Sequence, residues 1–274
     1  MVTTICKLMG SYKRTSCRLC NSKYLKKVLP LKPIPTSEQY SNDKNISINQ
    51  KRYPIDLYQC LECLHIQQLD IVDPADLWQE YSYFSGNTSN MPTHFLDEYK
   101  LIDQSFSGIF KHKRVLDIGS NDGSFLEVFK NKSWKAIGVD PAKAPADEAN
   151  LKGIKTLIGY FDLSLKDKIL DYLGGPPSLV TMYNAFAHID NIDDVLSNIV
   201  EILDNENPSI FRFEVQYVGA LIDNLLIPSI FHEHISHYSL VSLSRFLSKH
   251  EFVMIDASTN NIQHGSLVVS STHK

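Results

Sequence analysis

From Lys113 onward, short apolar runs alternate with amphipathic stretches, and this alternation limits the possible folds more than any other feature of the sequence. Such short runs are typical of buried strands, and the stretches between them are typical of helices. The apolar runs are Val115–Ile118, Ala136–Val139, Ile154–Ile158, Leu179–Met182 and Ile210–Phe213. The candidate helices are Gly123–Lys130, Leu163–Tyr172 and Asp193–Leu203. The pattern predicts an α/β fold with a doubly wound, mostly parallel sheet.

The first predicted strand runs directly into a tight turn between two glycines, Gly119 and Gly123. Right-handed crossovers place the carboxyl end of this strand at the ligand crevice of the sheet. Gly119 allows the backbone to approach a ligand closely, and Asp117 puts a carboxylate at the strand end. The glycines do not match G-x-G-x-x-G. The turn instead resembles motif I of the Rossmann-like class I methyltransferases, in which no pyrophosphate has to be held.

An acidic residue also ends the second predicted strand, at Asp140-Pro141, 23 residues beyond Asp117. A carboxylate there can accept two hydrogen bonds from a ribose diol. Asn184 closes the fourth strand. An ordinary strand–turn–helix with a capping aspartate is the alternative, but three polar strand ends together favour S-adenosylmethionine. The predicted cofactor-binding residues are Asp117, Gly119, Ser120, Asn121, Asp122, Gly123, Asp140, Pro141 and Asn184.

Two C-x-x-C pairs, Cys17–Cys20 and Cys60–Cys63, lie 39 residues apart near the N-terminus. Each spacer lets a tight turn point both thiolates at one ion, and four thiolates complete a tetrahedral Zn²⁺ site. Chance pairing of thiols and a redox-active C-x-x-C are the alternatives. A redox motif is expected beside a strand–helix unit, which neither pair adjoins. We therefore expect a structural zinc ion in a small N-terminal domain, with Cys6 uninvolved.

The overall composition is that of an ordinary globular protein, with 43% hydrophobic and 21% charged residues. A net charge of −4 argues against a protein built mainly to coat nucleic acid. The sequence shows neither a secretory signal nor an apolar stretch long enough to span a bilayer. A cytoplasmic location without a membrane partner is the expectation, and in that compartment paired cysteines usually bind metal.

The texture of the sequence divides the chain into four ranges. We expect a zinc-binding module at residues 1–75 and a linker or substrate-lid segment with one helix at 76–110. The methyltransferase domain is expected at 111–258. Residues 259–274 are expected to begin a further domain.

Motifs along nearly the whole chain resemble, in order, those of the sugar C-methyltransferases that act on nucleotide-linked keto-deoxyhexoses. They include the Cys-Arg-x-Cys start, Tyr53-Pro54, His65 after the second cysteine pair, Tyr81–Ser85, Gly138–Pro141, Asn184-x-x-x-His188-x-Asp190, Phe213–Val215, Phe231–Ser236 and His264–Leu267. The resemblance implies an enzyme that deprotonates a keto-sugar, linked to dTDP or another nucleotide, beside its carbonyl. The resulting enolate would then attack the methyl group of S-adenosylmethionine.

The resemblance also assigns roles to side chains. His234 would be the base or proton relay, Glu233 would orient the sugar or the imidazole, and His188 would line the opposite side of the pocket. Tyr81 or Tyr83 would offer a phenol to the substrate. The residue types agree, because an imidazole titrates near neutrality and an adjacent carboxylate can hold its tautomer. His232 and His234 as metal ligands, or as surface histidines, are the alternatives.

Three positions depart from the family pattern. Phe231 stands where the family commonly has a tyrosine, so either the activity would be reduced or the role of that phenol would pass to Tyr217 or Tyr238. Leu64 replaces a glycine after the second cysteine pair, where a turn with positive φ is expected. The family continues into a further Rossmann-like domain, whereas this sequence ends at Lys274. That ending suggests a fragment, a split gene or a degenerate member.

Two other functions remain open from the sequence. One is a methyltransferase that modifies RNA or protein and uses the zinc module for recognition. The stretch after Asn184 lacks the proline–aromatic motif typical of amino-group methylation. The other is a non-catalytic protein that only binds the cofactor, which Phe231 and the early end of the sequence favour.

Overall fold

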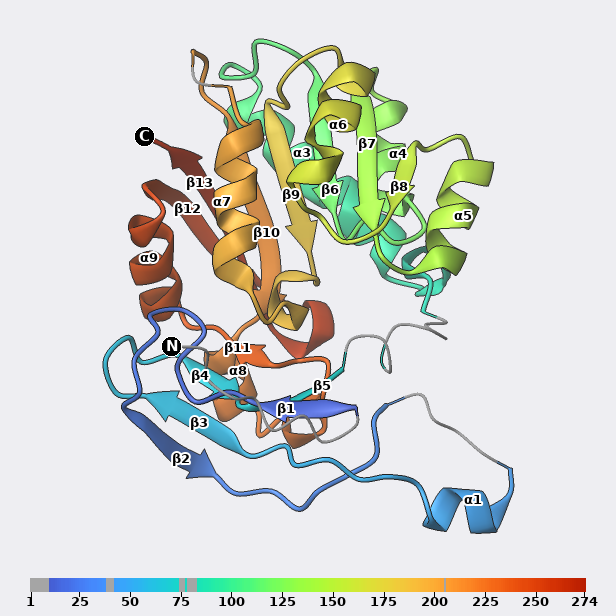
Figure 1. Cartoon of the computed structure of the whole chain (residues 1–274). Helices are drawn as coiled ribbons and strands as arrows, with labels where there is room; N and C mark the ends of the chain where they lie inside the picture. The colour runs from blue at the N-terminus through green and yellow to red at the C-terminus, as the bar shows by residue number, and fades with distance from the viewer. Residues whose placement is uncertain (1–9, 38–41, 74–76, 78–82, 205) are drawn as a thin grey trace.

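The structure is a computed structural model that describes residues 10–37, 42–73, 77, 83–204 and 206–274 (Figure 1). Within these residues, a seven-stranded sheet is flanked by helices, and a four-stranded sheet forms the basis of a smaller N-terminal module. The N-terminal module, residues 10–73 of the described chain, lies beneath the carboxyl ends of the central strands of the large sheet.

The large sheet has the strand order β12-β13-β10-β9-β6-β7-β8. Its strands are β6 (Arg114–Ile118), β7 (Lys135–Asp140), β8 (Thr156–Ile158), β9 (Leu179–Tyr183), β10 (Ile210–Gln216), β12 (Phe252–Asn260) and β13 (Ser266–His273). The strands from β10 to β8 in that order are parallel to one another. They coincide with the five apolar runs of the sequence, so the α/β fold with a mostly parallel sheet is confirmed.

Helices cover both faces of this sheet, which makes it doubly wound (Figure 1). One face packs against α6 (Lys166–Leu173), α7 (Ile192–Ile202) and α9 (Leu240–Lys249), and the other against α3 (Met91–Phe106), α4 (Ser124–Lys130) and α5 (Lys143–Leu151). Each helix packs on the sheet through an apolar face, as α7 illustrates. Its buried residues Ile192, Val195, Leu196, Ile199 and Ile202 recur at helical spacing and form one apolar stripe.

The N-terminal module is held together by short antiparallel strands. Its sheet has the order β11-β4-β3-β2, with β2 at Leu25–Leu29, β3 at Leu57–Cys60, β4 at Ile66–Gln68 and β11 at Ser236–His237. Strand β1 (Ser11–Lys13) pairs with β5 (Asp70–Val72), and α1 is Lys44–Ile48. Strand β11 comes from far along the chain. The structural unit is therefore larger than the range 1–75 that the sequence indicated.

The remaining elements are short. They are α8 (Val218–Asp223) and the 3₁₀ turns η1 (Ser85–Asn87), η2 (Leu163–Leu165), η3 (Phe186–His188), η4 (Ile227–Ser229) and η5 (Ile262–His264). None of the helices in the described part of the chain combines the length and the apolar character that crossing a membrane requires.

The C-terminal residues differ from their expected place. The sequence assigned residues 259–274 to the start of another domain, whereas Ser266–His273 form β13 inside the large sheet. Strand β13 is antiparallel to β10 on one side and to β12 on the other. Its run Leu267–Val269 is buried, and Leu267 and Val269 belong to the core layer that α6, α7 and α9 cover.

Leu64 takes the left-handed backbone conformation, with φ of 66°, at the turn that follows the second cysteine pair. Its amide donates a hydrogen bond to the carbonyl of Cys60, which closes the turn. The side chain is exposed, so little apolar burial offsets the backbone strain. A left-handed residue with a Cβ costs about 1–2 kcal/mol.

We expect Leu64→Gly to raise the free energy of unfolding by about 0.5–1 kcal/mol, because relief of the strain exceeds the added entropy of the unfolded chain. Urea unfolding of the zinc-loaded protein measures this change. Leu61→Gly is the matched control: Leu61 is exposed in the same turn and has no positive φ. The Leu61→Gly variant should lower the free energy of unfolding. Equal destabilisation by both variants would contradict the account.

Candidate active site and zinc centre

A cavity of about 1030 Å³ opens at the carboxyl ends of the parallel strands. This volume suits a cofactor together with a small substrate. Its lining includes most of the residues that the sequence singled out, namely Tyr83, Asp117, Gly119, Ser120, Asn121, Asp140, Pro141, Asn184, His188, Glu233 and His234. Tyr81 lies outside the described residues. Residues from the turn after β6 and from the His-Glu-His segment therefore share one cavity.

The turn after β6 brings backbone close to the cavity at Gly119, which has φ of 76°. A Cβ at this position would lie 2.5 Å from the Cβ of Ala185, so only glycine fits there. Beneath the turn, the hydroxyl of Thr181 donates a hydrogen bond of 2.7 Å to the buried carboxylate of Asp117. Burial raises the pKa of Asp117 to about 7. The site thus holds a carboxyl group that need not be fully charged.

Asp140 links the first two strand ends. Its two carboxylate oxygens accept hydrogen bonds of 2.8 Å from the backbone amides of Asn121 and Ala142. Burial raises its pKa. Each carboxylate oxygen has a further lone pair, so Asp140 can still accept hydrogen bonds from a ligand diol.

Two predicted cofactor residues lie outside the lining of the large cavity. Asp122 accepts hydrogen bonds from the backbone amide and hydroxyl of Ser124 at the start of α4, and from the amide of Gly86. Gly123, with φ of 73°, packs against Ile154 and Ala149. Both residues therefore contact other parts of the protein and shape the turn from behind.

Buried polar atoms without partners mark where a ligand fits. Among the described residues, Ser120 Oγ, Asn184 Oδ1 and Gln216 Oε1 are buried and accept or donate no hydrogen bond, and all three side chains line the cavity. Such atoms are costly unless a ligand satisfies them. Polar groups of a bound ligand would satisfy these atoms, and S-adenosylmethionine offers such groups in its ribose and its methionine tail.

His234 has a defined tautomer. Its Nδ1 lies 3.1 Å from the carbonyl oxygen of Ser229, which can only accept, so Nδ1 carries the proton. Nε2 therefore holds a lone pair. Burial lowers the pKa of His234 to about 4, so the ring is neutral at pH 7. The neutral ring can accept a proton at Nε2, while the burial that keeps it neutral also lowers its basicity.

Two rings lie against His234, that of Phe231 tilted and that of His188 stacked. The centroid of Phe231 lies 4.0 Å from that of His234, and the ring of His188 lies nearly parallel at 5.2 Å. Burial, followed by the neighbouring His234, lowers the pKa of His188 to about 3. Both imidazoles are therefore neutral, and Phe231 covers one of them with an apolar face.

Glu233 and His232, the neighbours of His234 in the sequence, lie in different environments. Glu233 lines the cavity and accepts a hydrogen bond from the hydroxyl of Ser37. His232 is buried outside the cavity and donates from Nε2 to the carbonyl of Tyr53, 3.2 Å away. His232 and His234 occur in no metal-ligand cluster of the described residues. The alternative of a two-histidine metal site therefore gains no support.

The phenol that Phe231 lacks is not supplied as the sequence suggested. Tyr217 and Tyr238 line no part of the cavity, and Tyr238 is fully buried with its hydroxyl 3.4 Å from the carbonyl of Phe186. Tyr83, by contrast, lines the cavity and accepts a hydrogen bond from Thr88. Of the predicted pair Tyr81 and Tyr83, the structure describes only Tyr83.

Several residues that line the cavity were not predicted from the sequence. They are the turn after β8 (Gly159–Asp162), Gln216 at the end of β10, Asp194 and Asn198 on α7, Ser37 and Gln263. The ends of β8 and β10 were the recoverable signals, because carboxyl ends of parallel strands meet at one edge of the sheet. The other positions depend on long-range packing.

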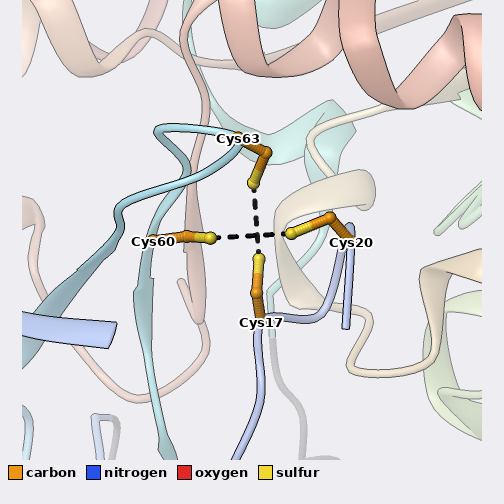
Figure 2. A group of neighbouring side chains, drawn as sticks. All are labelled: Cys17, Cys20, Cys60 and Cys63. Carbon is orange, nitrogen blue, oxygen red and sulfur yellow. Dashed lines mark hydrogen bonds between the residues drawn. The ribbon is translucent and has the colours of Figure 1, made fainter. Parts of the chain in front are cut away.

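The four predicted metal ligands converge on one point (Figure 2). The sulfurs of Cys17 and Cys63 lie 3.5 Å apart, as do those of Cys20 and Cys60, and all four lie within 4.8 Å of one another. Zn–S bonds of about 2.3 Å in a tetrahedron put sulfurs about 3.8 Å apart. The geometry thus fits a zinc ion with four thiolate ligands and no open position.

Comparison with known proteins places the chain in a family. A model described as "Methyltransferase domain" matches residues 93–257, and one described as "Putative zinc binding domain" matches residues 17–78. The first covers more than half of the chain. The chain belongs to the methyltransferase family. The family match and the four-cysteine cluster support S-adenosylmethionine and zinc as the cofactors of this methyltransferase.

The relatives agree with this placement. The C-methyltransferase NovU of Streptomyces niveus is 29% identical over 255 residues, which make up 92% of this methyltransferase and 59% of NovU. This chain therefore spans about three fifths of the length of that relative. The fold is similar to that of the PH0226 protein from Pyrococcus horikoshii OT3, with a TM-score of 0.55 and 14% identity over 72% of this chain and 98% of that one.

A second structure with the same fold is the plantazolicin methyltransferase BpumL, solved in complex with a pentazolic desmethylPZN analog and SAH. Its TM-score is 0.54, with 12% identity, and the match covers 68% of this chain and 86% of BpumL.

For the zinc centre, we expect the purified protein to contain about one zinc ion per chain and Cys17→Ser to lose it. Unfolding free energy should fall by several kcal/mol, because metal binding is coupled to folding of the small module. Elemental analysis and urea unfolding measure both quantities. Cys6→Ser should retain the metal. Full zinc content in Cys17→Ser would rule out this ligand set.

For the cofactor site, we expect Asp140→Asn to weaken S-adenosylmethionine binding about 10- to 100-fold, because hydrogen bonds to a charged group contribute about 1.5–3 kcal/mol. Titration calorimetry measures the Kd. Asp147→Asn is the matched control, since Asp147 lies exposed on α5 and pairs only with Lys143 among the described residues. If Asp140→Asn leaves the Kd unchanged, Asp140 does not bind the cofactor.

Proposed function

We propose that this methyltransferase transfers a methyl group to a carbon atom of a nucleotide-linked keto-deoxysugar. The observation that carries the proposal is the neutral, Nδ1-protonated imidazole of His234 in the same cavity as the turn after β6. A carbon acid needs such a base, because the proton beside a carbonyl is removed before the carbon can act as a nucleophile. The similarity to the C-methyltransferase NovU supports carbon as the methyl acceptor.

Residues that line the cavity can carry each step of the proposed reaction. Nε2 of His234 takes the proton from the carbon beside the substrate carbonyl, and the C–H electrons move to form an enolate. When bound, S-adenosylmethionine would supply an electrophilic methyl group on sulfonium, and the electrons of its C–S bond would stay on sulfur as the new C–C bond forms. His188 and Tyr83 line the cavity and are the candidates to hold the enolate oxygen. Glu233 fixes the substrate.

The acidic lining of the cavity suits a positively charged cofactor and a substrate whose diphosphate lies outside the cavity. Every charged side chain that lines it within the described residues is acidic, and no lysine or arginine is among them. Acidic side chains attract a sulfonium and repel a diphosphate. The keto-sugar ring would therefore enter the cavity while the nucleotide diphosphate stays outside it. The same charge disfavours RNA as the substrate, since RNA recognition requires a basic surface.

The test is incubation of the protein with S-adenosylmethionine and a dTDP-4-keto-deoxysugar, followed by mass spectrometry. The substrate should gain one methyl group. His234→Gln should lower the rate about 100-fold or more, because general-base catalysis contributes about 10²–10⁴-fold. His112→Gln, at an exposed position, is the control. Cofactor binding without any gain of a methyl group would contradict the proposal and favour a protein that only binds the cofactor.

The pH profile belongs to the same experiment. Because burial lowers the pKa of His234 to about 4, the imidazole stays unprotonated well below its usual pKa of 6.5. The methylation rate should hold as pH falls from neutrality and drop only on approach to pH 4.

A further inference from the structure

The segment that carries His234, residues 231–236 and here called the cavity loop, is fastened by the N-terminal module. Nε2 of Gln68 donates hydrogen bonds to the carbonyls of Phe231, at 2.8 Å, and of His234, at 3.0 Å. The backbone amide of Gln68 donates to the carbonyl of Ile235, at 2.9 Å. One residue of β4 thus satisfies three carbonyls of the cavity loop.

A second contact comes from between the zinc ligands. Arg18 follows Cys17 directly, and its guanidinium is fully buried. One η nitrogen donates to the carbonyl of Ile235 and to the hydroxyl of Ser236. The other donates to the carbonyl of Gln68, at 2.9 Å, and pairs with Asp190, at 3.3 Å. A buried guanidinium is tolerated only with such partners, so its position is tightly fixed.

Asp190 extends this link to the cavity itself. It lines the cavity two residues after His188, and Arg14 and Tyr12 also bind its carboxylate. Burial raises the pKa of Asp190, but the guanidinium groups of Arg18 and Arg14 and the hydrogen bond from Tyr12 outweigh burial and hold that pKa below its usual value. The N-terminal module therefore holds both imidazole-bearing segments, one through Asp190 and one through the cavity loop.

We propose that Gln68 and Arg18 are positioning residues, which use the zinc-fixed Cys17–Cys20 knuckle as a rigid support to set the imidazole of His234 against the cofactor. Zinc fixes the backbone at Arg18, Arg18 holds Gln68 and Ile235, and Gln68 holds the backbone on both sides of Glu233. Neither side chain lines the cavity. The kinetic part rests on the proposed function, whereas the conformational part does not.

The test uses Gln68→Met, which keeps length and volume but cannot donate to the two carbonyls. Hydrogen-exchange mass spectrometry should show faster exchange in residues 230–238 and unchanged protection in residues 114–140. Zinc content and the Kd for S-adenosylmethionine should stay within about twofold. The kcat for methylation should fall about 10- to 100-fold, because a displacement of about 1 Å is enough for such a loss.

Controls separate positioning from stability. Gln59→Met lies on β3, one strand farther from the cavity loop, and should leave exchange, kcat and Kd unchanged. Arg18→Lys keeps the charge but loses the planar fork, so it should reproduce the effects of Gln68→Met instead of restoring normal behaviour.

Two results would overturn the proposal. One is unchanged exchange in residues 230–238 in Gln68→Met. The other is faster exchange that spreads to residues 114–140 with a matching loss of cofactor affinity, which would show a general loss of stability. If the parent protein methylates no keto-sugar, the proposed function fails, while the exchange measurement still decides whether Gln68 and Arg18 hold the cavity loop.

Discussion

The antiparallel pairing of β11 with β4 joins the two parts of the molecule at the place where chemistry is proposed. Ser236 and His237 pair with Gln67 and Ile66, so the strand just after His234 belongs to the sheet of the zinc module. The turn after β6, by contrast, belongs to the large sheet. The cavity lies between a cofactor turn and a histidine that different structural units position. Its geometry depends on how these units are joined.

The backbone of the turn after β6 was predictable because its determinants are local. A buried strand, a glycine with positive φ and an acidic second strand end lie within 26 residues, from Val115 to Asp140. The fold class follows from the same alternation of strands and helices. The cysteine knuckles were predictable for a similar reason, since the two-residue spacing alone sets the direction of each thiolate pair.

The remaining features depend on contacts between distant residues, which no local pattern contains. No local pattern near Ser266 predicts that its strand lies between β10 and β12. Likewise, no local pattern near Ser236 predicts its pairing with Gln67. Asp122 has the sequence position of a cofactor residue, yet its carboxylate accepts from Ser124 and Gly86 behind the turn. The role expected of Tyr238 fails because its hydroxyl lies within the protein core.

A crystal structure of the zinc-loaded protein with S-adenosylhomocysteine would show directly how the cofactor sulfur lies relative to the imidazole of His234. The account predicts that Asp140 accepts hydrogen bonds from the ribose hydroxyls and that the cofactor sulfur faces the part of the cavity lined by His188 and His234. A small substrate would fit between the sulfur and Nε2 of His234. A sulfur directed away from His234, with that imidazole open to bulk water, would contradict carbon methylation by this site even with the cofactor fully bound.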